Sequence, residues 1–375
     1  MRAVHVGLNL IFLVPGETGG MEVAARETIP ELVRLAPAGT RFTAFVNRDA
    51  GPGPWGELIP KVELPVSVAN RIEWVRGEQL LLPRLARREG VDLVHSLAST
   101  GPGWGRFRRV VTVHDLIYRR FPDAHAGLRA LGMRMLVPLA VRRSDRIITD
   151  SASTKRDLIE LLGTPEARID VVPLGIGALE RVAPLGEAQL RERFALGERP
   201  LLLALSAKRP HKNLAALLEA CALLETRPIL VLGGYPTAYE RELRERAQTL
   251  GIAEDVRWPG WLQADELEGL WRISAGFVFP SLYEGFGLPV LEAMARGVVV
   301  ACSTAASLPE VAGDAALLFD PADPRAIADA IAALLAGGAA IERLRAAGLR
   351  RAGEFTWERS ASLTLASYAR ALADS

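Results

Sequence analysis

The chain has 375 residues, of which 49% are hydrophobic, and a formal net charge of +1. The length is too great for one ordinary core and suits two domains, and the near-zero charge argues against a dedicated nucleic-acid binder. Two cysteines, Cys221 and Cys302, are too few for a disulfide framework or a metal cluster, so a reducing cytoplasm is the expected compartment.

The first half of the chain alternates strand-like apolar runs with helical patterns. The run over residues 3–10 could pass for a secretory signal, but it lacks a small-residue cleavage site and is interpreted as a buried first strand. Gly19-Gly20 follows, either as a phosphate-cradling loop or as a tight turn, without the Gly-x-Gly-x-x-Gly of a nicotinamide site. The alternation predicts a doubly wound α/β domain. Its further strands are predicted at residues 41–46, 61–66, 91–95, 110–114, 146–149 and 169–172.

A His-Asp pair, His114 and Asp115, ends the strand predicted at residues 110–114. Open α/β sheets bind ligands at the carboxyl ends of their strands, so this pair is a candidate contact. The alternative is a helix cap by Asp115 beside a packed histidine.

Two helical stretches, within residues 71–90 and 125–146, are rich in arginine. Such faces either rest on anionic lipid or are solvated surface, and the sequence leaves both readings open. The arginines are Arg84, Arg87, Arg88, Arg129, Arg134, Arg142 and Arg143.

Pro184 and Gly186 mark a linker, and a strand at residues 201–205 then opens a second domain. The turn after this strand carries Lys208, Arg209 and Lys212, although the whole chain has only four lysines. Three cations at the carboxyl end of a strand suit a diphosphate leaving group, whose charge they can neutralise. A solvated basic turn is the alternative.

Two further strands are predicted at residues 228–232 and 256–262, the second ending in a turn that contains Gly260 and Trp261. A glycine-aromatic turn of this kind can border a nucleotide base through backbone groups and stacking. A tryptophan packed in the core is an equally good interpretation.

Residues 277–301 predict a strand, a turn, a helix and another strand. The helix is expected from Pro289 to Gly297, because proline suits a first helical position and glycine follows a last one. Residues 284–287, with two glycines before the helix, form an expected anion site. Glu284 and Glu292 would repel phosphate and suit hydroxyls, so the predicted ligand is a nucleotide sugar.

Residues 284–292, Glu-Gly-Phe-Gly-Leu-Pro-Val-Leu-Glu, match the paired-glutamate motif of the retaining GT-B glycosyltransferases of family 4, also called glycosyltransferase group 1. The resemblance covers nearly the whole chain, and the form around His114, Lys212 and Glu284 resembles the mannosyltransferase branch. It implies an α/β fold of the GT-B type, with two Rossmann-like doubly wound domains facing a central cleft. The implied parts are an acceptor-side domain at 1–180, a donor-binding domain at 187–355 and a final helix at 356–375 that crosses back to the first domain.

The resemblance also implies residue roles, with His114, Glu284 and Lys212 as the catalytic residues. Lys212 would grip the donor diphosphate, and His114 would contact the transferred hexose through its imidazole or its backbone carbonyl. The family's second cation is an arginine directly after a glycine, where this chain has Ser206-Ala207, so Lys208 or Arg209 replaces it and Arg209 is preferred. The implied donor-binding residues are Gly19, Gly20, Lys208, Arg209, Lys212, Trp261, Glu284, Gly285, Phe286, Gly287, Leu288 and Glu292.

The predicted reaction moves a hexose, with mannose from GDP-mannose favoured over UDP-hexoses, to an acceptor hydroxyl with retention at the anomeric carbon. No cofactor or metal is expected, because cations and a helix dipole can neutralise the diphosphate. The expected acceptor is a saccharide, a lipid-linked molecule or a small molecule, nucleic acid is not an expected partner, and the expected location is the cytoplasm or the inner face of its membrane. The alternatives are a glycoside hydrolase with Glu284 and Glu292 as its carboxylates, a nucleotide-sugar epimerase on the same fold, and a non-catalytic nucleotide-sugar sensor.

Overall fold

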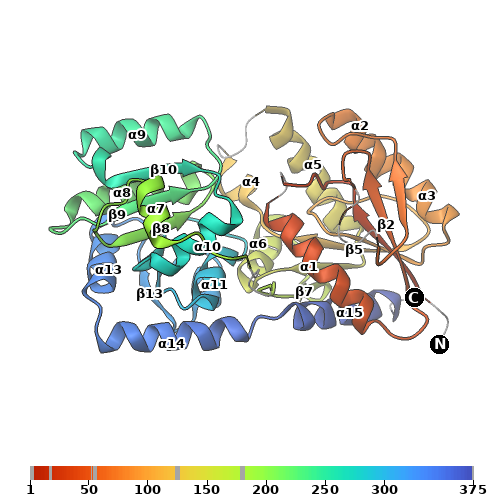
Figure 1. Cartoon of the computed structure of the whole chain (residues 1–375). Coiled ribbons are helices and arrows are strands. Elements are labelled where there is room, and N and C mark those ends of the chain that lie inside the picture. Colours follow the sequence, from red (N-terminus) through yellow and green to blue (C-terminus); the bar gives the residue numbers. More distant parts are fainter. Residues whose placement is uncertain are drawn as a thin grey trace. The chain divides into compact units, whose positions relative to one another are not determined.

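A computed structural model describes residues 4–16, 19–51, 53, 57–122, 127–177 and 182–373, with only the backbone described for 127–131. The chain divides into two compact units. Unit 1 comprises Met1–Gly177 and Phe355–Ser375, and unit 2 comprises Ala178–Glu354. In each unit the strands of one sheet lie between layers of helices (Figure 1).

The described part of unit 1 contains a parallel sheet of seven strands in the order β3-β2-β1-β4-β5-β6-β7. Every strand that the sequence pattern predicted here is present, because runs of apolar residues between turn signals leave little choice once both sheet faces are covered. All residues of β1 are buried. The strands are β1 (His5–Leu10), β2 (Arg41–Asn47), β3 (Lys61–Leu64), β4 (Leu93–Ser96), β5 (Arg108–Val113), β6 (Arg146–Thr149) and β7 (Ile169–Val171).

The helices of unit 1 connect these strands and cover the sheet (Figure 1). One of them contains a π-helical turn, η1, which the sequence pattern did not predict. Such turns insert one extra residue into a helix and are frequent at functional sites. The helices are α1 (Gly20–Leu35), α2 (Arg71–Arg76), η1 (Gly77–Leu81), α3 (Leu82–Arg88), α4 (Ile117–Arg120), α5 (Gly127–Arg143), α6 (Ala152–Leu162), η3 (Glu166–Arg168) and α15 (Trp357–Ala373).

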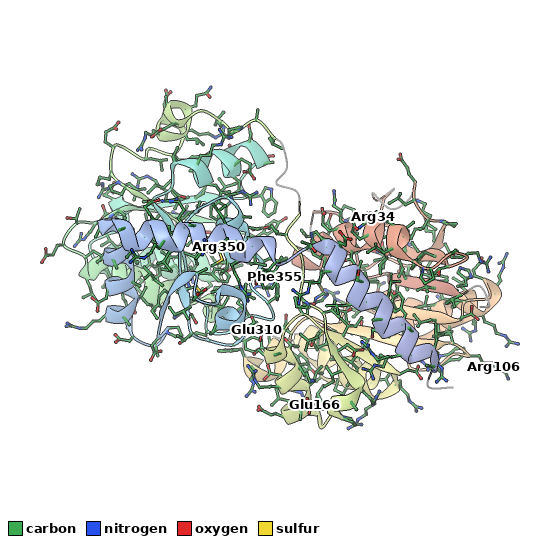
Figure 2. All side chains as sticks on the ribbon, turned by 90° about the horizontal axis from the view of Figure 1, so that it is seen from below. Arg34, Arg106, Glu166, Glu310, Arg350 and Phe355 are labelled. Atoms are coloured by element: carbon green, nitrogen blue, oxygen red, sulfur yellow. The ribbon has the colours of Figure 1, made fainter. Side chains whose placement is uncertain are left out.

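The last helix, α15, packs on unit 1 beside α1 (Figure 2, where Arg34 of α1 and Phe355 are labelled). Gly175 permits its entry, because a Cβ at this position would lie 2.3 Å from the backbone nitrogen of Trp357. Inside the unit, the Tyr368 hydroxyl lies 2.7 Å from His95 Nδ1. The C-terminal segment therefore completes the first core.

The described part of unit 2 contains a parallel sheet of six strands in the order β10-β9-β8-β11-β12-β13. The predicted strands are present, and β13 was not predicted. The strands are β8 (Leu201–Leu205), β9 (Ile229–Gly233), β10 (Val256–Gly260), β11 (Gly276–Phe279), β12 (Val300–Ser303) and β13 (Ala316–Phe319). The helices are α7 (Glu187–Arg193), η4 (Pro210–Lys212), α8 (Leu214–Leu223), α9 (Tyr239–Thr249), η5 (Ala253–Asp255), α10 (Ala264–Ile273), α11 (Leu288–Ala295), α12 (Leu308–Ala312), α13 (Pro324–Ala336) and α14 (Ala339–Gly353).

Each sheet reverses its strand order at one place, between β1 and β4 in unit 1 and between β8 and β11 in unit 2. The chain leaves the carboxyl ends of these two neighbouring strands in opposite directions. Ligands of open α/β sheets bind at such points. The loops after β1, β4, β8 and β11 are therefore the first places to look for a site.

Asp170 should be the main polar anchor of α15. It pairs with Arg146 (2.5 Å) and Arg370 (2.9 Å), and it accepts a hydrogen bond from the Ser367 hydroxyl (2.7 Å). We predict that Asp170→Ala destabilises unit 1 by about 3 kcal/mol, because Arg146 loses its carboxylate in a mostly buried position. Denaturant unfolding would measure this loss, and limited proteolysis would report release of the helix.

Glu342→Ala provides the matched control, since its ion pair with Arg345 lies on the surface of α14. It should change the free energy of unfolding by less than about 0.5 kcal/mol. Equal effects of the two substitutions would contradict the anchoring role of Asp170.

Candidate functional site

The clearest constellation in unit 2 is an ion pair between Lys212 and Glu284. Lys212 Nζ lies 2.6 Å from Glu284 Oε1, and both side chains are mostly buried. Lys212 ends η4, which follows β8, and Glu284 follows β11, so the pair joins the two strands where the sheet order reverses. The structure thus brings together two of the three residues predicted to be catalytic.

The other two cations of the turn have different surroundings. Lys208 is fully buried, and its Nζ donates hydrogen bonds to the carbonyl oxygens of Leu232 (2.9 Å) and Gly234 (2.8 Å). Burial lowers the pKa of Lys208 to about 8, with Arg244 adding to this shift and Glu240 opposing it. Arg209 is half-buried and has no ion-pair partner among the described residues. Lys208 therefore stabilises the end of β9, whereas the guanidinium of Arg209 can still bind an anionic ligand.

The turn over residues 284–287 has the geometry that its glycines suggested. Gly287 has φ +120°, and a Cβ there would lie 2.8 Å from the Leu308 side chain. The Ser307 hydroxyl donates to the carbonyl oxygens of Glu284 (3.0 Å) and Phe286 (2.6 Å) and so fixes the turn. Helix α11 begins at Leu288, one residue before the predicted start at Pro289. The role of Ser307 was not predicted, since a serine so far along the chain gives no local signal.

Glu292 lies on α11 near a second ion pair, between Arg296 and Glu268, whose Nε and Oε1 atoms are 3.0 Å apart. Within the described part of the chain, the Glu292 carboxylate accepts no hydrogen bond. Burial raises the pKa of Glu292, Arg296 lowers it, and the Glu268 carboxylate raises it further. A half-buried carboxylate to which no neighbouring described group donates can accept hydrogen bonds from the hydroxyl groups of a ligand.

Trp261 lies on the surface, so the interpretation as a core tryptophan is wrong. The residue is 58% exposed, and its ring packs against that of Tyr235, with ring centroids 4.5 Å apart and an interplanar angle of 31°. The two residues follow the neighbouring strands β10 and β9, whose carboxyl ends are joined by a hydrogen bond from the Gly234 amide to the Gly260 carbonyl (2.7 Å). This exposed aromatic pair offers a flat surface to a planar group.

In unit 1, His114 follows β5 and is held on both sides of its ring. Nδ1 lies 2.6 Å from Asp150 Oδ2, and Nε2 donates to the Leu97 carbonyl oxygen (2.9 Å). Burial alone would lower the pKa of His114, but the Asp150 carboxylate and the Leu97 carbonyl raise it to about 9. The backbone carbonyl of His114 accepts a hydrogen bond from the Thr154 hydroxyl at 3.2 Å.

Asp150 was missed by the sequence reasoning, although a signal existed. It directly follows β6, which pairs with β5, so its side chain and that of His114 leave the same edge of the sheet. Asp115, which was considered as a helix cap, accepts a hydrogen bond from the amide of Ile117 (2.9 Å), the first residue of the short helix α4, although Leu116 holds the N-cap position.

Gly19 and Gly20, which follow β1, lie within the described residues, whereas the two residues before them lie outside. Gly19 has φ +61° and precedes α1, which begins at Gly20. Both glycines are exposed, and no side chain caps the helix. The amides at this helix end are thus accessible from solvent, as the predicted loop requires.

Among the described residues, no three His, Cys, Asp or Glu side chains gather closely enough to hold a metal ion. None of the described helices has the length and hydropathy of a membrane span.

The chain is similar to known glycosyltransferases in sequence and in fold. Residues 187–351 match the family model of glycosyl transferases group 1, and residues 18–178 match glycosyltransferase family 4. O-antigen chain mannosyltransferase B of Escherichia coli is 34% identical over 70% of this chain and 70% of its own length. D-inositol 3-phosphate glycosyltransferase of Segniliparus rotundus is 32% identical over 95% and 86% of the two chains.

The solved structure of sucrose-phosphate synthase from Thermosynechococcus elongatus has the same fold, with a TM-score of 0.78, 21% identity and coverage of 99% of this chain and 100% of that one. Two Rossmann-like units and a last helix that returns to the first unit characterise this GT-B fold. The match of both halves to family models, and of most of the chain to curated relatives, agrees with the paired-glutamate motif. The protein belongs to the family 4, or group 1, glycosyltransferases.

Proposed function

We propose that this glycosyltransferase transfers mannose from GDP-mannose to an acceptor hydroxyl, with retention at the anomeric carbon and without a metal ion. The observation that carries the proposal is the Lys212–Glu284 pair at the point where the strand order of unit 2 reverses. It sets a cation suited to a diphosphate beside a carboxylate suited to sugar hydroxyls.

The diphosphate is assigned to Lys212, Arg209 and the backbone amides of the turn before α11. Lys212 exchanges its bond to Glu284 for the more highly charged ligand. Arg209 supplies the second cation, because its guanidinium forms no ion pair with another described residue. Lys208 is left out of this set, since its ammonium already donates to two carbonyl oxygens. The positive end of the α11 dipole adds to the same stabilisation.

The sugars are assigned to the two carboxylates, with Glu284 on one side of the turn and Glu292 about one helical turn inside α11. The acceptor oxygen attacks the anomeric carbon from the face that the diphosphate leaves. As the bond to the diphosphate oxygen breaks, the acceptor proton passes to that oxygen, so no enzyme nucleophile is needed. The cations hold the growing charge of the leaving group, which is where such interactions accelerate a reaction.

The contact of His114 with the hexose is assigned to its backbone carbonyl. Both ring nitrogens are occupied, by Asp150 and by the Leu97 carbonyl. Using the ring would require breaking one of these buried bonds, whereas a carbonyl oxygen that accepts one hydrogen bond from Thr154 can accept a second.

The choice of mannose is supported by relatives named as mannosyltransferases, including the one from Escherichia coli that covers 70% of this chain. The exposed Tyr235–Trp261 pair supports a planar purine such as guanine, which stacks on aromatic rings. For the acceptor we propose a hydroxyl of a saccharide or of a lipid-linked saccharide, as in the O-antigen chain of that relative's name.

A surface of unit 1 supports peripheral association of the enzyme with the anionic cytoplasmic face of a membrane. Four exposed residues follow one another at four-residue spacing along α2, η1 and α3, namely Ile72, Arg76, Leu80 and Arg84. Because the π-turn has more residues per turn than an α-helix, residues at this spacing stay on one side of the combined helix. Ile72 is 81% exposed, and Arg84 lies 6.0 Å from the ring of the exposed Trp104. We call these five residues the α2–α3 stripe. Its mixture of apolar and cationic side chains suits an interfacial helix.

The donor assignment predicts the outcome of a thermal-shift panel of GDP-, UDP-, ADP- and dTDP-sugars. GDP-mannose should stabilise the protein most, because at a fixed ligand concentration the stabilisation grows with the logarithm of the ratio of ligand concentration to Kd. Lys212→Ala should weaken donor binding roughly 10- to 100-fold, the value of a charge-assisted hydrogen bond. Lys61→Ala, at an exposed lysine of β3, should leave it unchanged. A GDP-mannose shift that survives Lys212→Ala, or release of free mannose or an epimerised donor, would contradict the proposal.

The two hydrogen bonds that hold the His114 ring predict how its imidazole titrates. In the wild type, the imidazole should titrate near pH 9. Asp150→Asn removes the main group that raises this pKa, so burial should then bring it below the ordinary 6.5. Titration of the imidazole by ¹⁵N NMR would measure both values, with Asp115→Asn as the control that shifts the pKa much less. A wild-type ring that titrates near 6.5 would refute the locked geometry.

The α2–α3 stripe predicts binding to vesicles that contain phosphatidylglycerol and not to vesicles of phosphatidylcholine alone. Each arginine near an anionic surface contributes about 1 kcal/mol, so Arg76→Gln with Arg84→Gln should weaken binding roughly 30-fold. Arg325→Gln with Arg343→Gln, at exposed arginines of unit 2, is the matched control. Vesicle sedimentation would separate these variants. Equal binding by both pairs would reject a role for the stripe.

A further inference from the structure

Unit 1 contains a buried carboxylate, Glu78, that has no part in the proposed reaction. It lies in the π-turn η1 and is 2% exposed. Its Oε1 accepts hydrogen bonds from Asn9 Nδ2 (3.1 Å) and the Thr100 hydroxyl (3.0 Å), and its Oε2 accepts from Gln79 Nε2 (3.3 Å). Every donor is neutral, so the charge is solvated by dipoles rather than paired.

The donors come from the place where the strand order of unit 1 reverses. Asn9 lies near the carboxyl end of β1, directly opposite Ser96 of β4, and its Nδ2 also donates to the Ser96 hydroxyl (3.1 Å). Thr100 lies in the loop that follows β4. Glu78 thus joins the ends of two strands whose loops diverge.

The adjacent Gln79 holds the same loop by its backbone. Its Nε2 donates to the Gly101 carbonyl (2.8 Å), and its Oε1 accepts from the Gly103 amide (3.0 Å). Gly101 lies so close to Ser96 that a Cβ would be 2.6 Å from the serine hydroxyl. We call residues 97–103 the β4 loop. Its Thr100, Gly101 and Gly103 are all attached to the π-turn.

The β4 loop begins at the residue that holds His114. The Leu97 carbonyl accepts the hydrogen bond of His114 Nε2 at 2.9 Å. A shift of this loop would move that carbonyl, and with it the ring, the backbone of His114 and the pairing with Asp150. The contacts form one continuous path from Glu78 through Thr100 and the loop to His114.

Burying this carboxylate has an energetic cost that an apolar side chain would avoid. Burial raises the pKa of Glu78 to about 7, against hydrogen bonds from Thr100, Asn9 and Gln79 that lower it. A polar network of this kind, with each member bonded, fixes one conformation of the surrounding backbone more strictly than apolar packing does.

We propose that Glu78 is a positioning residue for the transfer reaction, which acts through the β4 loop to fix the Leu97 carbonyl and thereby His114. This inference rests on the role of His114 in the proposed function. It assigns to the π-turn a task that packing of unit 1 does not require.

The test compares Glu78→Met, which removes the acceptor at similar volume, with Glu78→Gln, whose Oε1 can still accept from Asn9 and Thr100. Glu78→Met should lower kcat up to about 100-fold, the effect of a displacement near 1 Å, with a smaller effect on KM for the donor, whose proposed diphosphate-binding residues lie in unit 2. It should also shift the ¹⁵N resonances of the His114 imidazole. Glu78→Gln should restore both kcat and the resonances.

Glu73→Met is the matched control on the same helical segment, because Glu73 accepts from the Ser67 amide (2.9 Å) and pairs with Arg48 (3.3 Å), away from the β4 loop. It should leave the His114 resonances unchanged. Thr100→Val, which removes one donor and spares the carboxylate, should shift them in the same direction as Glu78→Met but less, and it decides the matter if Glu78→Met does not fold.

The resonance measurement needs no substrate, so it separates the two proposals. If the wild type shows no mannosyl transfer while the His114 resonances respond to Glu78, the proposed function fails and the path through the β4 loop stands. Unchanged His114 resonances in Glu78→Met and Thr100→Val, or the same shift in Glu73→Met, would overturn the positioning role.

Discussion

The ion pair between Lys212 and Glu284 depends on a long-range constraint, because 72 positions of sequence separate the two residues. They meet only because β8 and β11 are neighbours in the sheet and their chains leave in different directions. A parallel sheet requires crossover helices, and these helices carry the intervening chain away from the strand ends. The fold therefore determines where a cation and a carboxylate can face each other. The two glycines of the turn after Glu284 add no side chains of their own that would cover the backbone amides at the same place.

The two nearby lysines show how burial separates residues of one type into different roles. Lys208 and Lys212 lie in the same turn, yet only Lys208 is fully buried. Its ammonium is compensated by carbonyl dipoles of the β9 end, which is a structural arrangement that a ligand cannot easily compete with. Lys212 is compensated by a carboxylate at a strand end, and a diphosphate offers the same kind of partner with more charge. One cation of the turn is thus compensated by backbone carbonyls and the other by a carboxylate.

Much of the fold was predictable, because strands such as β8 and β11 are set by local apolar runs and turn residues. The Glu284 to Glu292 turn was predictable for the same reason, as glycine and proline act on their own backbone. The partners of the site residues were not predictable from the sequence. That Asp150 pairs with His114, or that Lys208 turns inward, depends on which strands become neighbours and on which rotamers then fit. The π-turn was equally invisible, since one extra helical residue changes periodicity by less than the sequence pattern resolves.

The sheets of both units reverse their strand order once, but the polar groups at the two reversals differ. At the reversal between β8 and β11, a lysine is paired with a carboxylate, whereas at the reversal between β1 and β4 a carboxylate accepts hydrogen bonds from neutral donors. The Lys212–Glu284 pair is mostly buried but retains some exposure, whereas Glu78 is 2% exposed and is bonded on both carboxylate oxygens. Because the His114 ring donates its second hydrogen bond to the loop that Glu78 holds, the internal network contacts the one predicted catalytic residue of that unit. The same topological feature thus places an ion pair in one sheet and a network of neutral donors around a carboxylate in the other.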